Sequence, residues 1–298
     1  MKTNHCVRLF AVVALLACVG FARAETLFSI DFETPPYAIG NLWEQDRWVQ
    51  PRLTHYVNPQ VGEGVGANTS QVMGSHLAGP TATTTAGSDY KFAAPFTFTS
   101  ADTAVELYFK VYSARGAGGN QFSNAAIILG FPEVAVSDNY RVPAVGLYYK
   151  DYATHLPQTS IRSNPLVGSP TFGDVLAPAE WYEMKIVMDF SKNNTTPGHE
   201  AKFGKLDYYY RNLTQGETVD QFHLDGTIQN FDMYLVPNGN GEFVMSSFFA
   251  FVQVYNNYTQ NAFLDDIRMV NTIPEPSALA LSVCGLLGLL AYAWRRRK

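Results

Sequence analysis

Cysteine is scarce in this sequence, and its placement excludes disulfide bonds from most of the chain. The 298 residues include three cysteines, Cys6, Cys18 and Cys284. All three lie in the apolar segments at the two ends, so residues 25–270 contain none. The central segment must therefore be held together by side-chain packing, hydrogen bonds or a bound metal ion.

The motifs of common catalytic sites are also missing. No Gly-x-Ser-x-Gly motif occurs, and Gly198 to Lys205 has neither the glycine spacing nor the Ser/Thr of a phosphate-binding loop. The histidines of the central segment lack the spacing of zinc ligands; they are His55, His76, His155, His199 and His223. The sequence therefore favours a non-catalytic protein.

Basic residues are fewer than acidic residues between the two ends of the chain. Of the 21 basic residues, three precede Glu25 and four follow Val270, whereas Glu275 is the only one of 26 acids outside that range. Residues 25–270 hence carry 14 basic and 25 acidic side chains, a net charge of −11. A field of this sign repels phosphate backbones, so we expect no nucleic-acid partner; cations and neutral glycans are compatible with it.

Long apolar runs occur only at the ends of the chain. At the N-terminus, Lys2 and Arg8 precede an apolar run over residues 9–21, which ends in Ala22-Arg23-Ala24. This order of charged, apolar and small residues is typical of a secretory signal peptide, and the run is shorter than the roughly 20 residues of a membrane span. We therefore predict a signal peptide over residues 1–24.

The second apolar run covers residues 278–294 and is followed by Arg295, Arg296, Arg297 and Lys298. Its 17 residues would form a helix of about 25 Å, enough to cross a bilayer core. Because cytoplasmic flanks collect Lys and Arg, the four cations place the C-terminus in the cytoplasm. Residues 277–298 are thus predicted to be a transmembrane helix with a basic cytoplasmic tail, and the domain before it lies outside the cytoplasm.

The central segment has the alternation of β-strands. In residues 105–112 the aliphatic and Phe side chains occupy one parity and Glu, Lys and Tyr the other, and residues 182–190 repeat this pattern. Further strands are expected at 26–33, 71–77, 122–130, 141–150, 203–211, 243–255 and 263–270. About ten strands without a convincing helix predict an all-β domain over residues 25–270, a two-sheet antiparallel jelly-roll sandwich. Residues 81–85 are expected in a surface loop and residues 271–276 in a linker.

The C-terminal tail resembles the sorting signal of PEP-CTERM proteins. The resemblance rests on Pro274, Glu275 and Pro276, the apolar helix after them, and the cations Arg295, Arg296 and Arg297. Since proline restricts its own backbone and that of the preceding residue, this motif stays extended and accessible at the membrane face. The resemblance implies an exosortase-type protease as partner, in bacteria that make exopolysaccharide and biofilm. It further implies passage from the inner membrane to the cell surface or extracellular matrix.

The central domain resembles, more loosely, concanavalin-like and carbohydrate-binding jelly rolls. The resemblance is carried by Phe28 to Glu33, by Trp43 and Trp48, and by the closing segment of residues 263–269. Laminarinase-like enzymes of that fold carry Glu-x-Asp-x-x-Glu, which no segment matches. Residues 108–112, Tyr-Phe-Lys-Val-Tyr, are similar to an alginate lyase strand but lack its glycine.

Three acidic residues form a candidate metal site. Asp31 and Glu33 lie two apart on an expected first strand and so share a face, whereas Asp265 and Asp266 on the last strand point to opposite faces. If the first and last strands pair, then Asp31, Glu33 and Asp265 surround one position that suits a structural calcium ion. The alternative is that these acids are solvated at the edges of the sheet.

Tyrosines on the polar parity of their strands form a candidate glycan platform. Tyr108 and Tyr112 are four apart on one strand, about 13 Å at 3.3 Å per residue, and Tyr149, Tyr152 and Tyr209 are further candidates for exposure. Flat aromatic faces beside hydrogen-bonding groups suit sugar rings. The alternative is packing at the rim of a sheet, with the ring inward and the hydroxyl outward.

The features together predict an exported, surface-sorted and non-catalytic protein of the bacterial envelope or biofilm matrix that binds exopolysaccharide. Two other classes stay open at this point: a divergent glycoside hydrolase or lyase, and a purely structural surface protein. Turnover of a polysaccharide would identify an enzyme, and absence of both binding and turnover would identify a structural protein.

Overall fold

The computed structural model describes residues 23–50, 57–66, 68–74, 84–113, 123–129, 144–149, 157–161, 171–192, 202–232, 236–238, 242–254 and 262–273. Residues 1–22 and 274–298 lie outside this range, and with them nearly all of the predicted signal peptide, the Pro-Glu-Pro motif and the predicted membrane helix. Within the described part of the chain, no helix is long and apolar enough to cross a membrane.

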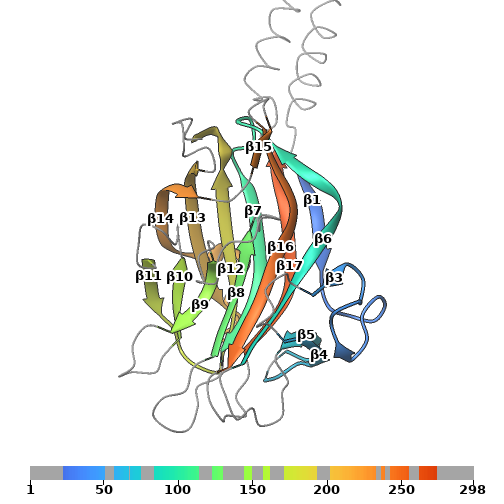
Figure 1. Ribbon diagram of the computed structural model, residues 1–298. Helices are drawn as coiled ribbons and strands as arrows, with labels where there is room; N and C mark the ends of the chain where they lie inside the picture. Colours follow the sequence, from blue (N-terminus) through green and yellow to red (C-terminus); the bar gives the residue numbers. More distant parts are fainter. Residues whose placement is uncertain are drawn as a thin grey trace, which may run out of the picture.

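One layer of the molecule is a nine-stranded antiparallel sheet (Figure 1). Its strands in spatial order are β14 (His223–Asp232), β13 (Lys202–Asn212), β12 (Trp181–Asp189), β7 (Val105–Ser113), β17 (Ala262–Ile273), β5 (Gln71–Gly74), β4 (Gln60–Glu63) and β2 (Gly40–Asn41). The ninth strand, β1 (Arg23–Ile30), pairs with β17.

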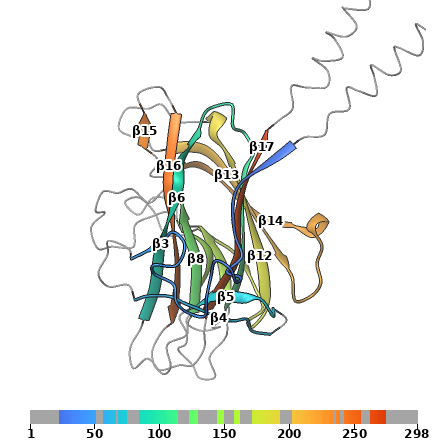
Figure 2. The ribbon, with the colours of Figure 1, turned by 90° about the vertical axis from the view of Figure 1, so that its right-hand side faces the viewer.

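The second layer is an eight-stranded antiparallel sheet packed against the first (Figure 2). Its spatial order is β11 (Thr171–Val175), β10 (Pro157–Ile161), β9 (Ala144–Tyr149), β8 (Ser123–Leu129), β16 (Glu242–Val254), β6 (Thr84–Phe98) and β3 (Trp48–Val49), with β15 (Val236–Asn238) paired to β16. The only helical elements among the described residues are two short 3₁₀ turns, η1 (Phe190–Lys192) and η2 (Val219–Gln221). The predicted all-β, two-sheet antiparallel sandwich is therefore confirmed.

The core lies between the two sheets and follows the predicted alternation. On β7 the burial alternates strictly along the strand, and Leu107, Phe109 and Val111 are fully buried. On β12, Met184 and Ile186 are buried in the same way. Because side chains of a strand point alternately to opposite faces, the intervening residues of both strands lie on the outer face of the nine-stranded sheet.

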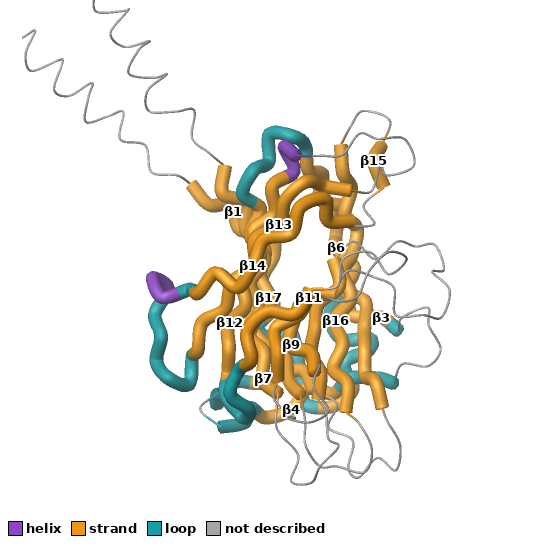
Figure 3. The backbone as a smooth tube through the Cα atoms, turned by 90° about the vertical axis from the view of Figure 1, so that its left-hand side faces the viewer, coloured by secondary structure: helices purple, strands orange, loops and turns teal. Residues whose placement is uncertain are grey.

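The two ends of the described chain lie side by side. β1 and β17 are antiparallel partners, with Arg23 opposite Ile273 and Ile30 opposite Ile267 (Figure 2). The expected pairing of the first and last strands is thus present. At another edge, β11 and β14, the edge strands of the two sheets, lie near each other (Figure 3). The backbone N–H of Asp174 on β11 donates to Asp225 on β14 at 2.7 Å.

Two sequence-based boundaries are wrong. Residues 84 and 85 were expected in a loop, yet they open β6, the longest strand at 15 residues, where Thr84 pairs with Val254. Likewise β17 continues to Ile273, three residues into the predicted linker. In both places the strand is held by its partner in the sheet, whereas the Gly, Ala and Asn residues there carry weak strand propensity of their own.

Candidate functional site

The outer face of the nine-stranded sheet gathers most of the polar and aromatic residues singled out above. Its central strand β7 directs Glu106, Tyr108, Lys110 and Tyr112 to this face, each half-buried. The neighbouring strands β17, β12 and β13 contribute side chains in register with them. Cross-strand register therefore arranges this face in rows that run across the strands.

One row runs through Tyr108. Arg268 on β17 lies opposite Tyr108, Tyr108 lies opposite Lys185 on β12, and Lys185 lies opposite Tyr209 on β13. We call these four residues the aromatic–cation row. Since neighbouring strands are about 4.8 Å apart, the row spans about 14 Å. Cations and tyrosines alternate along it.

The members of this row are in contact. The guanidinium of Arg268 lies 4.3 Å from the centre of the Tyr108 ring, and the ammonium of Lys185 lies 4.3 Å from that of Tyr209. Phe222, just after η2, packs over the row, 4.7 Å from the Lys185 ammonium and 6.1 Å from the Tyr108 ring. These cation–π contacts hold the long side chains of Arg268 and Lys185 in place.

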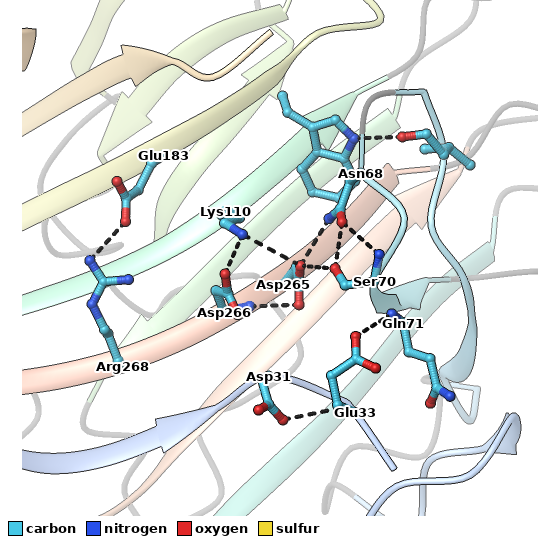
Figure 4. Close-up of polar contacts among 12 residues, drawn as sticks. Asp31, Glu33, Asn68, Ser70, Gln71, Lys110, Glu183, Asp265, Asp266 and Arg268 are labelled. Atoms are coloured by element: carbon cyan, nitrogen blue, oxygen red, sulfur yellow. Dashed lines mark hydrogen bonds and ion pairs between the residues drawn. The ribbon is translucent and has the colours of Figure 1, made fainter. Parts of the chain in front are cut away.

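A second row, through Lys110, is built on ion pairs. It joins Asp265, Lys110, Glu183 and Arg211 on four adjacent strands. Glu183 is only 2% exposed and lies between two guanidinium groups. Arg211 Nε donates to it at 2.6 Å. Arg268 Nη2 donates to it at 2.9 Å (Figure 4). Both carboxylate oxygens of this buried acid are thereby paired with charged donors.

Tyr112 does not extend the aromatic–cation row. Its ring lies 5.4 Å from that of Trp181 and 5.9 Å from that of Phe263, in a small apolar cluster on the outer face. The indole N–H of Trp181 donates to the carbonyl of Val65 at 2.8 Å, which anchors this cluster. Of the two predicted platform residues, Tyr108 therefore lies among cations, and Tyr112 is packed against other rings.

Tyr108 itself is held as a neutral phenol. Its hydroxyl donates to Glu106 at 2.6 Å. Burial, followed by the hydrogen bond and charge of Glu106, raises the pKa of Tyr108 well above its usual value. Because a general base needs an accessible deprotonated form near neutral pH, Tyr108 is poorly suited to proton abstraction.

Asp265 is fully buried at the end of the second row. Asn68 and Ser70 donate to its Oδ2 at 2.9 and 2.8 Å, and the Lys110 ammonium lies 4.0 Å away (Figure 4). Burial, followed by the charge of Asp266, raises the pKa of Asp265 from 3.8 to about 6. This carboxyl therefore titrates nearer to neutral pH than an ordinary aspartate.

Asp265 and Asp266 do not point to opposite faces as a regular strand would require. The register of β17 shifts between Asp265 and Arg268, and Asp266 has a φ of 45°. This β-bulge brings Asp266 into an ion pair with Lys110, the same ammonium that lies near Asp265. Beyond the bulge, Ile267 faces the core and Arg268 faces outward.

The three carboxylates predicted to bind calcium are not assembled into a site. β1 ends at Ile30 and Phe32 has a φ of 59°, so Asp31 and Glu33 are not alternate residues of one strand. Asp31 instead accepts from the backbone N–H of Glu33 at 3.1 Å, and Glu33 from that of Gln71 at 2.7 Å. Among the described residues, no three acidic, His or Cys side chains are grouped to hold a metal ion.

Sequence reasoning missed four residues of this face: Lys185, Arg268, Glu183 and Phe222. The first three belong to strands whose order in the sheet is non-sequential, β17-β7-β12, so their neighbours are far away along the chain. One signal was available for Arg268. Leu264, Ile267 and Met269 are spaced three and then two apart, which is the apolar pattern of a strand with one extra residue.

No protein-family model and no curated protein matches this sequence. Among solved structures, the globular domain of T. cruzi calreticulin is 11% identical, with a TM-score of 0.48, over 92% of this chain and 98% of that chain. Winged bean acidic lectin, in complex with methyl-α-D-galactose, is 13% identical, with a TM-score of 0.49, over 85% and 100%.

A PL-14 alginate lyase from Aplysia kurodai is 10% identical, with a TM-score of 0.45, over 71% of this chain and 87% of that chain. These three structures are a calreticulin domain, a lectin and an alginate lyase. At these identities and TM-scores the likeness carries no functional argument.

Proposed function

We propose that this chain is an exported, non-catalytic protein of the cell surface or extracellular matrix that binds polysaccharide on the outer face of its nine-stranded sheet. The observation that supports this proposal is the aromatic–cation row of Arg268, Tyr108, Lys185 and Tyr209. A row of about 14 Å offers half-buried rings and charged donors to one extended chain of sugars. Such a jelly-roll binding module has no need of a reacting group.

The surroundings of two buried acids on this face favour binding over catalysis. Asp265 has a pKa of about 6, the range of a general acid, but its side chain is 0% exposed and it accepts hydrogen bonds from Asn68 and Ser70. Glu183 is committed to Arg211 and Arg268. Neither carboxylate is available to a glycosidic oxygen.

The route to the surface rests on the sequence at the two ends. The signal-peptide pattern of residues 1–24 directs export, and the tail with Pro274, Glu275 and Pro276 addresses an exosortase-type protease in the inner membrane. In this proposal the precursor is anchored with its domain on the periplasmic side. Cleavage near the motif then delivers the domain to the surface or matrix.

Gel retardation of the full-length protein, purified in detergent, tests glycan binding against a panel of neutral and acidic polysaccharides. We expect retardation by at least one polymer, and loss of it in the double variant Tyr108→Ala/Tyr209→Ala, because both rings of the row are removed. The control is Tyr112→Phe, which keeps its packing against Trp181 and Phe263 and is expected to bind normally.

Thermal unfolding of each variant is measured alongside, so that loss of binding is separated from loss of folding. Retardation that survives the double change would place the binding surface elsewhere. Release of oligosaccharides from a polymer would identify an enzyme, and absence of both binding and release across the panel would identify a purely structural protein.

A further inference from the structure

We infer that the polysaccharide bound by the outer face is a polyuronate, whose carboxylates pair with Lys185 and Arg268. This inference rests on the proposed function and adds the chemical class of the ligand. It depends on which cations of the face are already paired with carboxylates and which retain hydrogen-bond donors.

Three cations of the outer face already form ion pairs with acidic side chains. Lys110 pairs with Asp266, and Lys205 pairs with Asp207 at 2.7 Å. Arg211 donates to Glu183 and to the carbonyl of Glu217, and its side chain is only 13% exposed. Their charges are neutralised within the protein.

Lys185 is held differently. Its ammonium lies over the rings of Tyr209 and Phe222, at 4.3 and 4.7 Å from their centres. Within the described residues, no carboxylate lies at ion-pair distance from it; the ion pairs of this face involve Lys110, Lys205, Arg211 and Arg268. An ammonium has three N–H donors, and ring faces stabilise its charge without accepting as a carboxylate does. Lys185 is therefore a positioned cation with donors left for an anion.

Arg268 has donor capacity of the same kind. Its Nη2 donates to Glu183 and its plane lies against Tyr108, while the side chain stays 34% exposed. A guanidinium carries five N–H donors, so one bond to Glu183 leaves others available. Its fork geometry matches a second carboxylate well.

The placement of these two cations favours a polymer over a small anion. Lys185 on β12 and Arg268 on β17 are separated by β7, so they lie about 10 Å apart with the Tyr108 ring between them. A polyuronate presents a carboxylate on every sugar and an apolar ring face between them. Residues 25–270 carry a net charge of −11, so the long-range field of the domain repels a polyanion, and affinity for a polyuronate must come from several local contacts along the polymer.

The test compares polygalacturonate with the same polymer after reduction of its carboxyl groups, using the full-length protein in detergent. We expect retardation by polygalacturonate and at least tenfold weaker binding of the reduced polymer. Lys185→Gln should raise the dissociation constant for polygalacturonate about tenfold, the effect of one lost charged contact. Lys185→Arg, which keeps the cation, should bind like the unmodified protein.

The matched control is Lys205→Gln, which makes the same charge change on the same face at a lysine already paired with Asp207. It should leave the dissociation constant unchanged. Equal binding of both polymers would overturn the polyuronate inference and leave glycan binding intact, whereas no binding to any polysaccharide would overturn both. Equal weakening by Lys185→Gln and Lys205→Gln would also overturn the inference, since it would show only a general charge effect.

Discussion

Glu183 and Asp265 lie on the same face of the sheet but are balanced by different partners. Glu183 is held by two guanidinium groups, from Arg211 and Arg268. Asp265 is held by the neutral donors of two residues, and its nearest cation, that of Lys110, lies 4.0 Å away and is shared with Asp266. The two buried acids thus differ in the charge of their surroundings, and burial raises the pKa of Asp265.

The raised pKa of Asp265 predicts a pH dependence of stability. Between about pH 4 and pH 6 the folded state keeps this proton, whereas the unfolded chain loses it. Its contribution to the free energy of unfolding should therefore be greatest below pH 4 and should fall by about 2–3 kcal/mol as the pH rises to about 6. Above pH 6 the contribution should stay level.

Urea unfolding at several pH values measures this effect, as the difference between the unmodified protein and Asp265→Asn. Other carboxyls also contribute to the pH dependence of stability, among them Glu180 and Glu217, whose pKa values are lowered. Their contributions are the same in both proteins and therefore cancel in the difference. A flat difference between the unmodified protein and Asp265→Asn across this pH range would contradict the prediction.

At the scale of elements, β17 organises the candidate site. Its bulge at Asp266 shifts the strand by one residue, so that Arg268 reaches the outer face opposite Tyr108. A shift of one residue moves every later side chain to the other face. The end of the strand is also tied down: Asn271 Nδ2 donates to Asp102 at 2.7 Å, and the N–H of Thr272 donates to the carbonyl of Ala104 at 3.1 Å.

These contacts predict where the folded domain ends. A chain of residues 25–273 should be more stable than one of residues 25–270 by about 2 kcal/mol, since the shorter chain loses two tertiary hydrogen bonds of about 1 kcal/mol each. The midpoint of urea unfolding at an unchanged slope measures the difference. Equal midpoints would show that β17 contributes no stability beyond Val270.

At the scale of the whole molecule, the two ends of the domain emerge together. Arg23 lies opposite Ile273 in the sheet, so the segment that enters the domain and the segment that leaves it are neighbours (Figure 1). In the proposed route to the surface, the predicted signal-peptide cleavage site after Ala24 then lies at this end of the sandwich, as does Ile273, the last described residue before the sorting motif. The outer face with the aromatic–cation row runs along its side.

The sorting proposal has a direct test in the producing bacterium. Replacing Pro274, Glu275 and Pro276 by alanine removes the extended, proline-restricted segment that a protease needs, so we expect the full-length form to accumulate in the inner membrane. Fractionation and immunoblotting measure the ratio of precursor to processed form. Processing at the normal level would mean that the tail serves as an anchor alone.

Much of the fold could be predicted from local patterns. The alternation in residues 105–112 and 182–190 reproduces β7 and β12 and their buried faces, because strand burial follows a period of two wherever one face covers a core. The start of β6 was not predicted, because Ala86 and Gly87, which follow its first two threonines, carry weak strand propensity and are held in the strand by pairing with β16.

The sequence by itself determined the composition of the candidate site's central strand: its parity already sets Tyr108 and Lys110 apart from the core. Only the tertiary structure decided what lies beside them. Strand order and the bulge in β17 bring Arg268 and Lys185 to either side of Tyr108, although these residues are 160 and 77 positions away along the chain. Register between strands is a property of the assembled sheet, so no local pattern records it.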